Sequence, residues 1–226
     1  GDVFLMKTLA FSGGKDSMAC LHLLRHELDC AIYVDTGYAY PETLALVDYA
    51  KTMIPVHIVY AARAEQNERE GIPSDIVPID YTKLGHATSG KKSALIQSYL
   101  GCCYENISLP LLSKAAELGV THLVDGQRND EKHTSTSRDG DVVYGIVRLH
   151  PIENWTSQEV MEYLSTKMEI PAHYSIKHSS LDCYDCTAYR KDSVDRVDWM
   201  RGAHPDLYAR YEKRAAILES AIKEAL

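Results

Sequence analysis

The chain has 226 residues, of which 45% are hydrophobic and 25% charged, a composition typical of one large globular domain or of one domain with an appended subdomain. The formal charge of −8 excludes binding of polyanions over the whole surface, so a nucleic acid would need a local basic patch, for which residues 128–138 and 196–214 are candidates. Because no apolar run approaches the ~20 residues of a membrane helix, we expect a cytoplasmic protein without a membrane partner.

Strands and helices alternate in the first quarter of the chain. Strands are predicted at residues 8–11, 30–34 and 56–60, and helices at about 15–28 and 41–52. This order indicates consecutive βαβ units, and therefore an α/β fold with an open, mostly parallel twisted sheet and helices on both faces. The residues from 61 to about 90 have mixed charge and little periodicity, and we interpret them as a loop or lid.

Regular structure resumes in the second half. The pattern predicts a helix over 107–118, a strand over 121–124, a polar surface loop over 126–140 and a strand within 142–148. Thr156 and Glu159 form a capping box that opens a helix ending near residue 167. Residues 191–226 are helical in pattern, with an interruption at 202–205, and we expect them to form a helical extension of a main domain over 6–190.

The strongest motif lies between the first predicted strand and the first predicted helix, and it reads Ser12-Gly13-Gly14-Lys15-Asp16-Ser17. The glycines allow a tight turn close to a ligand, the hydroxyl groups and the N–H groups of the helix terminus donate to phosphate oxygens, and Lys15 adds a cation. The spacing is not that of the Walker P-loop. The alternative interpretation is a glycine turn before a capped helix.

Two other polar segments follow predicted strands, namely Asp35-Thr36-Gly37 and Gly126-Gln127-Arg128. Open α/β sheets bind ligands at the carboxyl ends of their strands, and an arginine fork there suits a phosphate or a sulfate. The alternatives are a helix-capping role for Asp35 and a solvated Arg128.

Four of the six cysteines form two pairs, Cys102-Cys103 and Cys183-x-x-Cys186. In a reducing compartment such thiols favour a metal or redox role over structural disulfides. An adjacent pair is awkward for one tetrahedral zinc ion but suits a cluster with an iron at each corner. A zinc site that recruits His178 and a set of buried thiols are the alternatives, and the remaining two cysteines, Cys20 and Cys30, are expected in the core.

The motif S-G-G-x-D-S resembles the pyrophosphate loop of the adenine nucleotide α-hydrolase-like enzymes. The string V-D-T-G-Y-x-x-P-E-T, the G-Q-R segment, the P-I-x-x-W-T segment and the pattern C-C…C-x-x-C together resemble the sulfonucleotide reductases, that is, APS and PAPS reductases. The resemblance implies that residues 12–17, 35–37 and 126–128 bind ATP, APS or PAPS, with or without magnesium, and that Lys15 and Arg128 act in catalysis. It also implies that the four paired cysteines hold a 4Fe-4S cluster.

Two features depart from that family. No cysteine follows Cys186, whereas the reductases use a thiol in a C-terminal E-C-G-x-H tail, and an acidic Glu105 stands where the reductases place basic residues after the cysteine pair. We therefore expect ATP-dependent adenylation or α-phosphate cleavage coupled to cluster-dependent sulfur transfer, with a nucleic acid or a small molecule as sulfur acceptor. The alternatives are a reductase that forms sulfite with the thiol of another protein, and a catalytically silent nucleotide sensor or scaffold. The sequence does not determine whether the chain is a monomer or a homo-oligomer.

Overall fold

The computed structural model describes residues 5–131, 137–176 and 181–225, which belong to two units. The sheet unit comprises the described parts of Gly1–Val34, Pro41–Val59 and Pro110–Ser175. The helical unit comprises those of Asp35–Tyr40, Tyr60–Leu109 and Ile176–Leu226. Each unit is built from three separate stretches of sequence, so neither has the bounds 6–190 or 191–226 that the sequence predicts for the main domain and its extension. That division stays a prediction.

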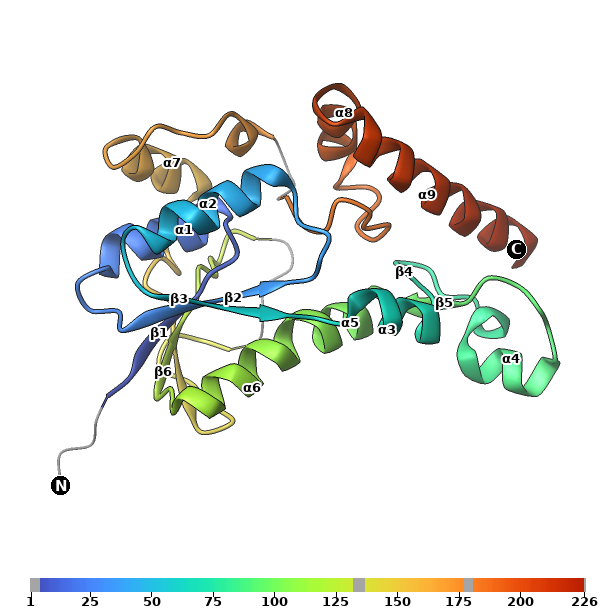
Figure 1. Ribbon diagram of the computed structural model, residues 1–226, viewed down its shortest axis with the longest axis horizontal. Helices are drawn as coiled ribbons and strands as arrows, with labels where there is room; N and C mark the ends of the chain where they lie inside the picture. The colour runs from blue at the N-terminus through green and yellow to red at the C-terminus, as the bar shows by residue number, and fades with distance from the viewer. Residues whose placement is uncertain (1–4, 132–136, 177–180, 226) are drawn as a thin grey trace. The chain divides into compact units, whose positions relative to one another are not determined.

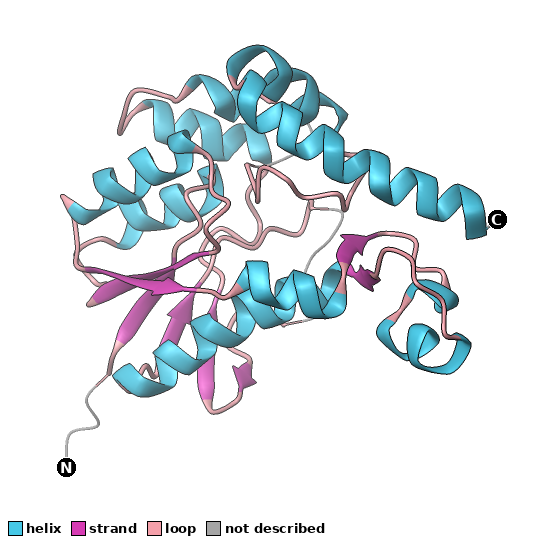
Figure 2. Ribbon diagram, turned by 45° about the vertical axis from the view of Figure 1, so that its right-hand side comes forward, coloured by secondary structure: helices cyan, strands magenta, loops and turns pink. Residues whose placement is uncertain are grey.

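Six strands of the described chain form one sheet in the order β3-β2-β1-β6-β8-β7 (Figures 1 and 2). Their bounds are Lys7–Ala10 for β1, Cys30–Asp35 for β2, Val56–Tyr60 for β3, His122–Val124 for β6, Val142–Val143 for β7 and Ile146–Leu149 for β8. Strand β1 pairs in parallel with β2 and β6, β6 pairs in parallel with β8, and only the short β7 among these pairs is antiparallel. The predicted α/β fold with a mostly parallel sheet is confirmed.

Helices cover both faces of this sheet (Figure 1). They are α1 Lys15–Leu24, α2 Pro41–Lys51 and α7 Ser157–Ser165 on one face, and α6 Leu109–Leu118 on the other. Strand β2 shows the alternation that this layering requires, because Ala31 and Tyr33 pack with α1, α2 and α7 whereas Ile32 packs with Ala115 of α6. Each large apolar side chain buried in this way contributes about 1.5–3 kcal/mol.

Local sequence signals set the ends of these helices. Pro41 begins α2, where its missing N–H has no intrahelical partner to lose. The Thr156 hydroxyl accepts from the Glu159 N–H at 3.2 Å, and the Glu159 carboxylate accepts from the Thr156 N–H at 2.7 Å, which confirms the predicted capping box of α7. A short 3-10 helix, η3 Ala172–Ser175, ends the sheet unit.

The helical unit contains short elements and two longer helices. They are α3 Arg63–Glu70, β4 Ile72–Ser74, η1 Ile79–Tyr81, α4 Lys83–Ser89, β5 Ile96–Ser98, α5 Tyr99–Cys103, the π-helical η2 Tyr104–Ser108, α8 Val194–Ala203 and α9 Pro205–Ala225. Strands β4 and β5 pair in parallel. One core joins Tyr40 and Tyr184 to Met200 of α8 and Tyr211 of α9, and another joins Tyr81 and Ile96 to Leu218.

The prediction of a loop or lid after residue 60 was wrong, since the structure places α3, β4, η1 and α4 there. Helix α3 buries Arg63 and Gln66 rather than apolar side chains, so no apolar residues mark its buried face in the sequence. The strand predicted within 142–148 is a hairpin, which turns at Tyr144 with φ 52° and Gly145 with φ 78°. None of the helices in the described chain has the length and apolar character needed to span a membrane.

Candidate nucleotide loop and four-cysteine site

The motif at residues 12–17 forms a self-supporting turn between β1 and α1 in the sheet unit. Gly13 has φ +77°, which favours glycine, and the Gly14 N–H donates to the Ser12 hydroxyl at 3.2 Å. The Ser17 hydroxyl lies 3.1 Å from that of Ser12 and donates to the Gly14 carbonyl at 3.0 Å. Tyr174, which sequence reasoning missed, donates from its hydroxyl to the Gly13 carbonyl at 3.0 Å. The turn is thereby held open at the N-terminus of α1, where backbone N–H groups favour anions.

Arg128 joins the loop after β6 to this turn. Its side chain is only 5% exposed, and its Nε lies 2.8 Å from Asp16 Oδ1. Its other nitrogens lie 2.5 Å from Asp130 Oδ1 and 3.7 Å from Glu131 Oε1. The Lys15 ammonium lies 3.1 Å from the other oxygen of Asp16. The two cations of the predicted site are thus matched by three carboxylates, which sequence reasoning did not anticipate.

Gly126 brings β6 close to the same turn. A Cβ at this position would lie 2.7 Å from the Asp16 carbonyl carbon, so only glycine fits without a shift of the backbone. Next to it, the Gln127 N–H donates to Asp125 Oδ1 at 3.3 Å. The structure therefore places Gly126 and Arg128 against the turn at 12–17, and the binding of a nucleotide by residues 126–128 stays a prediction.

Asp125 is held by two basic side chains that the sequence motifs did not single out. His150 Nδ1 lies 2.8 Å from Asp125 Oδ1, and Arg148 pairs with Oδ2 of the same carboxylate. Burial by itself would raise the pKa of Asp125, but the hydrogen bond from His150 and the charge of Arg148 lower it below its usual value. The same hydrogen bond raises the pKa of His150. This network fixes the carboxylate that orients Gln127.

Asp35 ends β2 and Thr36 and Gly37 follow it, and all three residues belong to the helical unit. The Gly37 N–H donates to Asp35 Oδ1 at 2.8 Å, and the Thr36 hydroxyl lies 3.2 Å from Cys183 Sγ. Thr36 and Gly37 also line a cavity of about 600 Å³ within the helical unit, a size typical of small-molecule pockets. Their predicted contact with a nucleotide stays a prediction, and Thr36 has a partner in the cysteine site as well.

All four paired cysteines line one small cavity of about 20 Å³ in the helical unit. Cys102 and Cys103 end α5, immediately before the π-helical η2, and the Cys186 N–H donates to the Cys183 carbonyl at 3.0 Å. All six cysteines are free thiols. Cys20 and Cys30 are buried, as expected of core residues. The structure thus brings together the two cysteine pairs that are far apart in the sequence.

The surroundings of these thiols fit an iron–sulfur cluster in donor chemistry. Asn67 and Asn106 point amide donors at Cys102 Sγ, at 3.4 Å and 3.7 Å, and hydrogen bonds to sulfur are one means by which proteins tune such clusters. Burial raises the pKa of Cys103 and of Cys186 to about 12, so these groups stay protonated until a metal offsets the cost of the buried thiolate.

The cavity itself has room for about one water molecule. In the described chain no three His, Cys, Asp or Glu side chains are arranged to hold a metal ion. His178, the alternative zinc ligand, lies outside the described residues.

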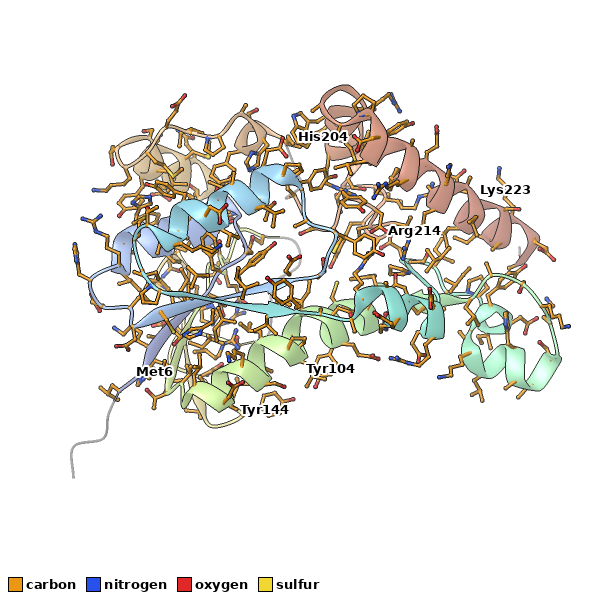
Figure 3. All side chains as sticks on the ribbon, viewed as in Figure 1. Met6, Tyr104, Tyr144, His204, Arg214 and Lys223 are labelled. Carbon is orange, nitrogen blue, oxygen red and sulfur yellow. The ribbon has the colours of Figure 1, made fainter. Side chains whose placement is uncertain are left out.

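Sequence reasoning missed the charged residues around the cysteines. Arg63 of α3 is 2% exposed and lines the same cavity. Its NH1 lies 2.8 Å from Oδ1 of Asp185, which stands inside the Cys-x-x-Cys segment. Arg214 of α9, labelled in Figure 3, lies 3.0 Å from Oδ2 of the same carboxylate. Nothing in the sequence indicates that a charged residue on a polar helix, such as Arg63, is buried. The position of Asp185 between Cys183 and Cys186 could have indicated that this carboxylate lies near the cysteine site.

Similarity to known proteins extends over most of this chain. The model of the phosphoadenosine phosphosulfate reductase domain matches residues 7–189. An adenosine 5'-phosphosulfate reductase of Rhodococcus erythropolis is 25% identical over 165 residues, which are 70% of this chain and 58% of that protein. A phosphoadenosine 5'-phosphosulfate reductase of Alkalilimnicola ehrlichii is 26% identical over 180 residues, which are 73% of this chain and 62% of that protein. The chain thus spans about six-tenths of the length of these relatives.

A solved structure supports the fold. The phosphate complex of the phosphoadenylyl-sulfate reductase from Candida auris superimposes with a TM-score of 0.55 at 18% identity, covering 82% of this chain and 84% of that one. This likeness concerns the fold alone. The resemblance inferred from the sequence motifs is confirmed by the match to the family model over most of the chain. The chain belongs to the phosphoadenosine phosphosulfate reductase domain family.

Proposed function

We propose that this chain is an enzyme that binds ATP with magnesium at residues 12–17 and 126–128 and cleaves it at the α-phosphorus, in support of sulfur transfer to an acceptor. The observation that carries this proposal is that three carboxylates surround the guanidinium of Arg128. Asp16, Asp130 and Glu131 lie within 4 Å of its guanidinium, at 2.8, 2.5 and 3.7 Å. Because these carboxylates neutralise the charge of Arg128, the loop attracts an anion without a metal ion only weakly. A nucleotide that carries a divalent cation such as magnesium binds better there, because carboxylate oxygens are preferred ligands of that cation.

The residues of the turn have distinct roles in this reaction. The Ser12 and Ser17 hydroxyls and the N–H groups at the start of α1 hold phosphate oxygens. Lys15 and Arg128 stabilise the negative charge that develops at the α-phosphate while an acceptor atom bonds to phosphorus and the bond to pyrophosphate breaks. Pyrophosphate leaves with the bridging oxygen. Sulfur then attacks the adenylated acceptor atom, and AMP leaves with the oxygen that joined it to the acceptor. The acceptor class is a nucleic acid or a small molecule.

The four cysteines Cys102, Cys103, Cys183 and Cys186 would hold a 4Fe-4S cluster in the helical unit. When bound, such a cluster supplies electron transfer or a carrier for sulfide. The protein's own contribution is a buried set of thiols with amide donors aimed at sulfur, as from Asn67 at 3.4 Å from Cys102 Sγ. The convergence of both cysteine pairs on one cavity supports this assignment.

The product formed under anaerobic conditions tests the proposal. Protein reconstituted with ferrous iron and sulfide is incubated with ATP and magnesium in the presence of candidate acceptors, and pyrophosphate and AMP are measured. The Lys15→Met variant is expected to lose product formation. Lys51→Met is the matched control, because Lys51 is an exposed residue of α2 whose ammonium lies 2.7 Å from Asp48 on the same helix. Absence of both products with every acceptor contradicts the proposal.

A second function is favoured by the names of the relatives. Adenosine 5'-phosphosulfate reductases and a phosphoadenosine 5'-phosphosulfate reductase match this chain. In that case APS or PAPS would yield sulfite with a thiol from another protein as reductant. The same anaerobic protein with APS or PAPS and dithiothreitol distinguishes this function, because it predicts sulfite and no pyrophosphate. Nucleotide binding without either product would identify a sensor or scaffold.

A further inference from the structure

A buried arginine from outside the cysteine motifs faces the four-cysteine cavity. Arg63 begins α3, is 2% exposed, and lines that cavity together with both cysteine pairs. Its guanidinium also lies 4.3 Å from the ring centre of Tyr38. Burial of this kind is expensive for a cation unless negative charge faces it. Beside the carboxylate of Asp185, the sulfur atoms that line the cavity can supply such charge once a metal displaces their protons.

The carboxylate beside Arg63 does not neutralise the region. Asp185 pairs with Arg63 at 2.8 Å and also with Arg214 at 3.0 Å, so two guanidinium groups share one carboxylate. A further buried arginine, Arg196 of α8, directs its nitrogens at the Cys183 and Cys186 carbonyls, at 3.5 Å and 3.3 Å. Three arginines, Arg63, Arg196 and Arg214, thus surround the Cys-x-x-Cys segment, together with the carboxylates of Asp185 and Asp182.

The acidic residue after the first cysteine pair does not contribute to this balance. Glu105 points to Arg69, whose NH2 lies 2.9 Å from its carboxylate, and both side chains are about half exposed. Arg63, by contrast, lines the cavity of both cysteine pairs and lies 2.8 Å from Asp185. Among the described residues that line the cysteine cavity itself, Arg63 of α3 is the one with a positive charge.

We propose that Arg63, held in place by Asp185, supplies the fixed positive charge that stabilises the anionic thiolate-bound cluster in this chain. The inference rests on the proposed four-cysteine cluster. Four thiolates bring more negative charge than the iron–sulfur core neutralises, and reduction adds one further electron. A buried guanidinium beside the sulfurs stabilises the cluster and favours its reduced state over its oxidised state.

Two substitutions that change the charge beside the cluster in opposite directions test this role. Arg63→Gln removes the positive charge, and it is expected to shift the midpoint potential to more negative values and to speed iron loss to a chelator by about tenfold. Asp185→Asn removes the opposing negative charge, and it is expected to shift the potential in the positive direction. Arg63→Lys is expected to recover part of the potential. Arg69→Gln, on the exposed side of the same helix, is the matched control and is expected to leave the cluster unchanged.

The readouts are iron and sulfide content, visible absorbance and the potential of protein reconstituted with ferrous iron and sulfide. General damage to the fold would weaken the cluster in both Arg63→Gln and Asp185→Asn, without opposite shifts in potential. If Arg63→Gln does not fold, the double variant Arg63→Gln/Asp185→Asn removes the pair without leaving a buried carboxylate facing the thiolates, and it is compared with Asp185→Asn alone.

Two negative results are distinguishable. A wild-type protein that takes up no iron overturns the cluster assignment, and this inference with it. A wild-type cluster whose potential and iron retention are unchanged when the Arg63 charge is removed overturns the role of Arg63 alone.

Discussion

Nε of Arg128 lies 2.8 Å from Oδ1 of Asp16, which ties the loop after β6 to the first turn of α1. The contact sets the electrostatic character of the predicted nucleotide loop, because it offsets the charge of the arginine before any ligand arrives. It also depends on a close approach of the two backbones, which Gly126 permits.

Replacement of Gly126 by alanine is expected to lower the free energy of unfolding by about 1–3 kcal/mol, since the new methyl group would lie 2.7 Å from the Asp16 carbonyl carbon. Urea unfolding at constant pH measures the change. Gly202 in α8 is the matched control, because a Cβ there meets nothing within 4 Å and alanine is expected to stabilise its helix by about 0.5–1 kcal/mol. Equal effects of the two substitutions would show that the close packing at Gly126 is not the cause.

The pair formed by His150 and Asp125 predicts a pH dependence of stability. The pKa of His150 is raised above 6.5 in the folded chain, chiefly by its hydrogen bond to Asp125, so the folded state holds more protons than the unfolded state just above that pH. This contribution is fully present below pH 6.5 and is lost as the pH rises through the raised pKa. The free energy of unfolding, measured by urea titration, is expected to fall over that window in the wild type.

The His150→Asn variant separates this effect from other titrations. Its unfolding free energy is expected to vary less above pH 6.5 than that of the wild type. At acid pH the lowered pKa of Asp125 acts in the opposite sense, because its contribution is present above pH 3.8 and is lost as the pH falls through the lowered pKa. If the unfolding free energies of the wild type and the variant change in parallel above pH 6.5, His150 is excluded as the titrating group.

The cysteine assignment predicts selective loss of iron. Cys183→Ser is expected to abolish most of the iron and sulfide bound after anaerobic reconstitution, because a hydroxyl group replaces one of four sulfur ligands. Cys30→Ser is the matched control, as Cys30 is buried beside Thr8, whose hydroxyl lies 3.4 Å from its sulfur, outside the cysteine cavity. Equal iron content in the two variants would exclude Cys183 as a ligand.

The sequence predicted the sheet and the turn at residues 12–17 because local signals specify them. Strand β2 reads as a short buried run, and Gly13 with φ +77° occupies a turn that a motif of this kind requires. The capping box at Thr156 is equally local, since both partners lie within one helical turn.

The charged contacts of both sites escaped prediction for a physical reason. Arg128 meets Asp16, and Arg63 meets Asp185, across long separations in sequence, and an arginine that is buried looks in the sequence like one that is solvated. Helix α3 illustrates the difficulty, because its buried positions, Arg63 and Gln66, are polar, so that no apolar side chains mark its inward face in the sequence. Only the packed chain reveals which charges face each other.

The most direct test of the central claim is calorimetric titration of the protein with ATP in the presence and absence of magnesium, alongside APS under the same conditions. The carboxylates of Asp16, Asp130 and Glu131 around Arg128 lead us to expect ATP to bind about tenfold more tightly with magnesium than without it, and more tightly than APS. Tight binding of APS that is insensitive to magnesium, with weak binding of ATP, would contradict the account and favour sulfonucleotide reduction.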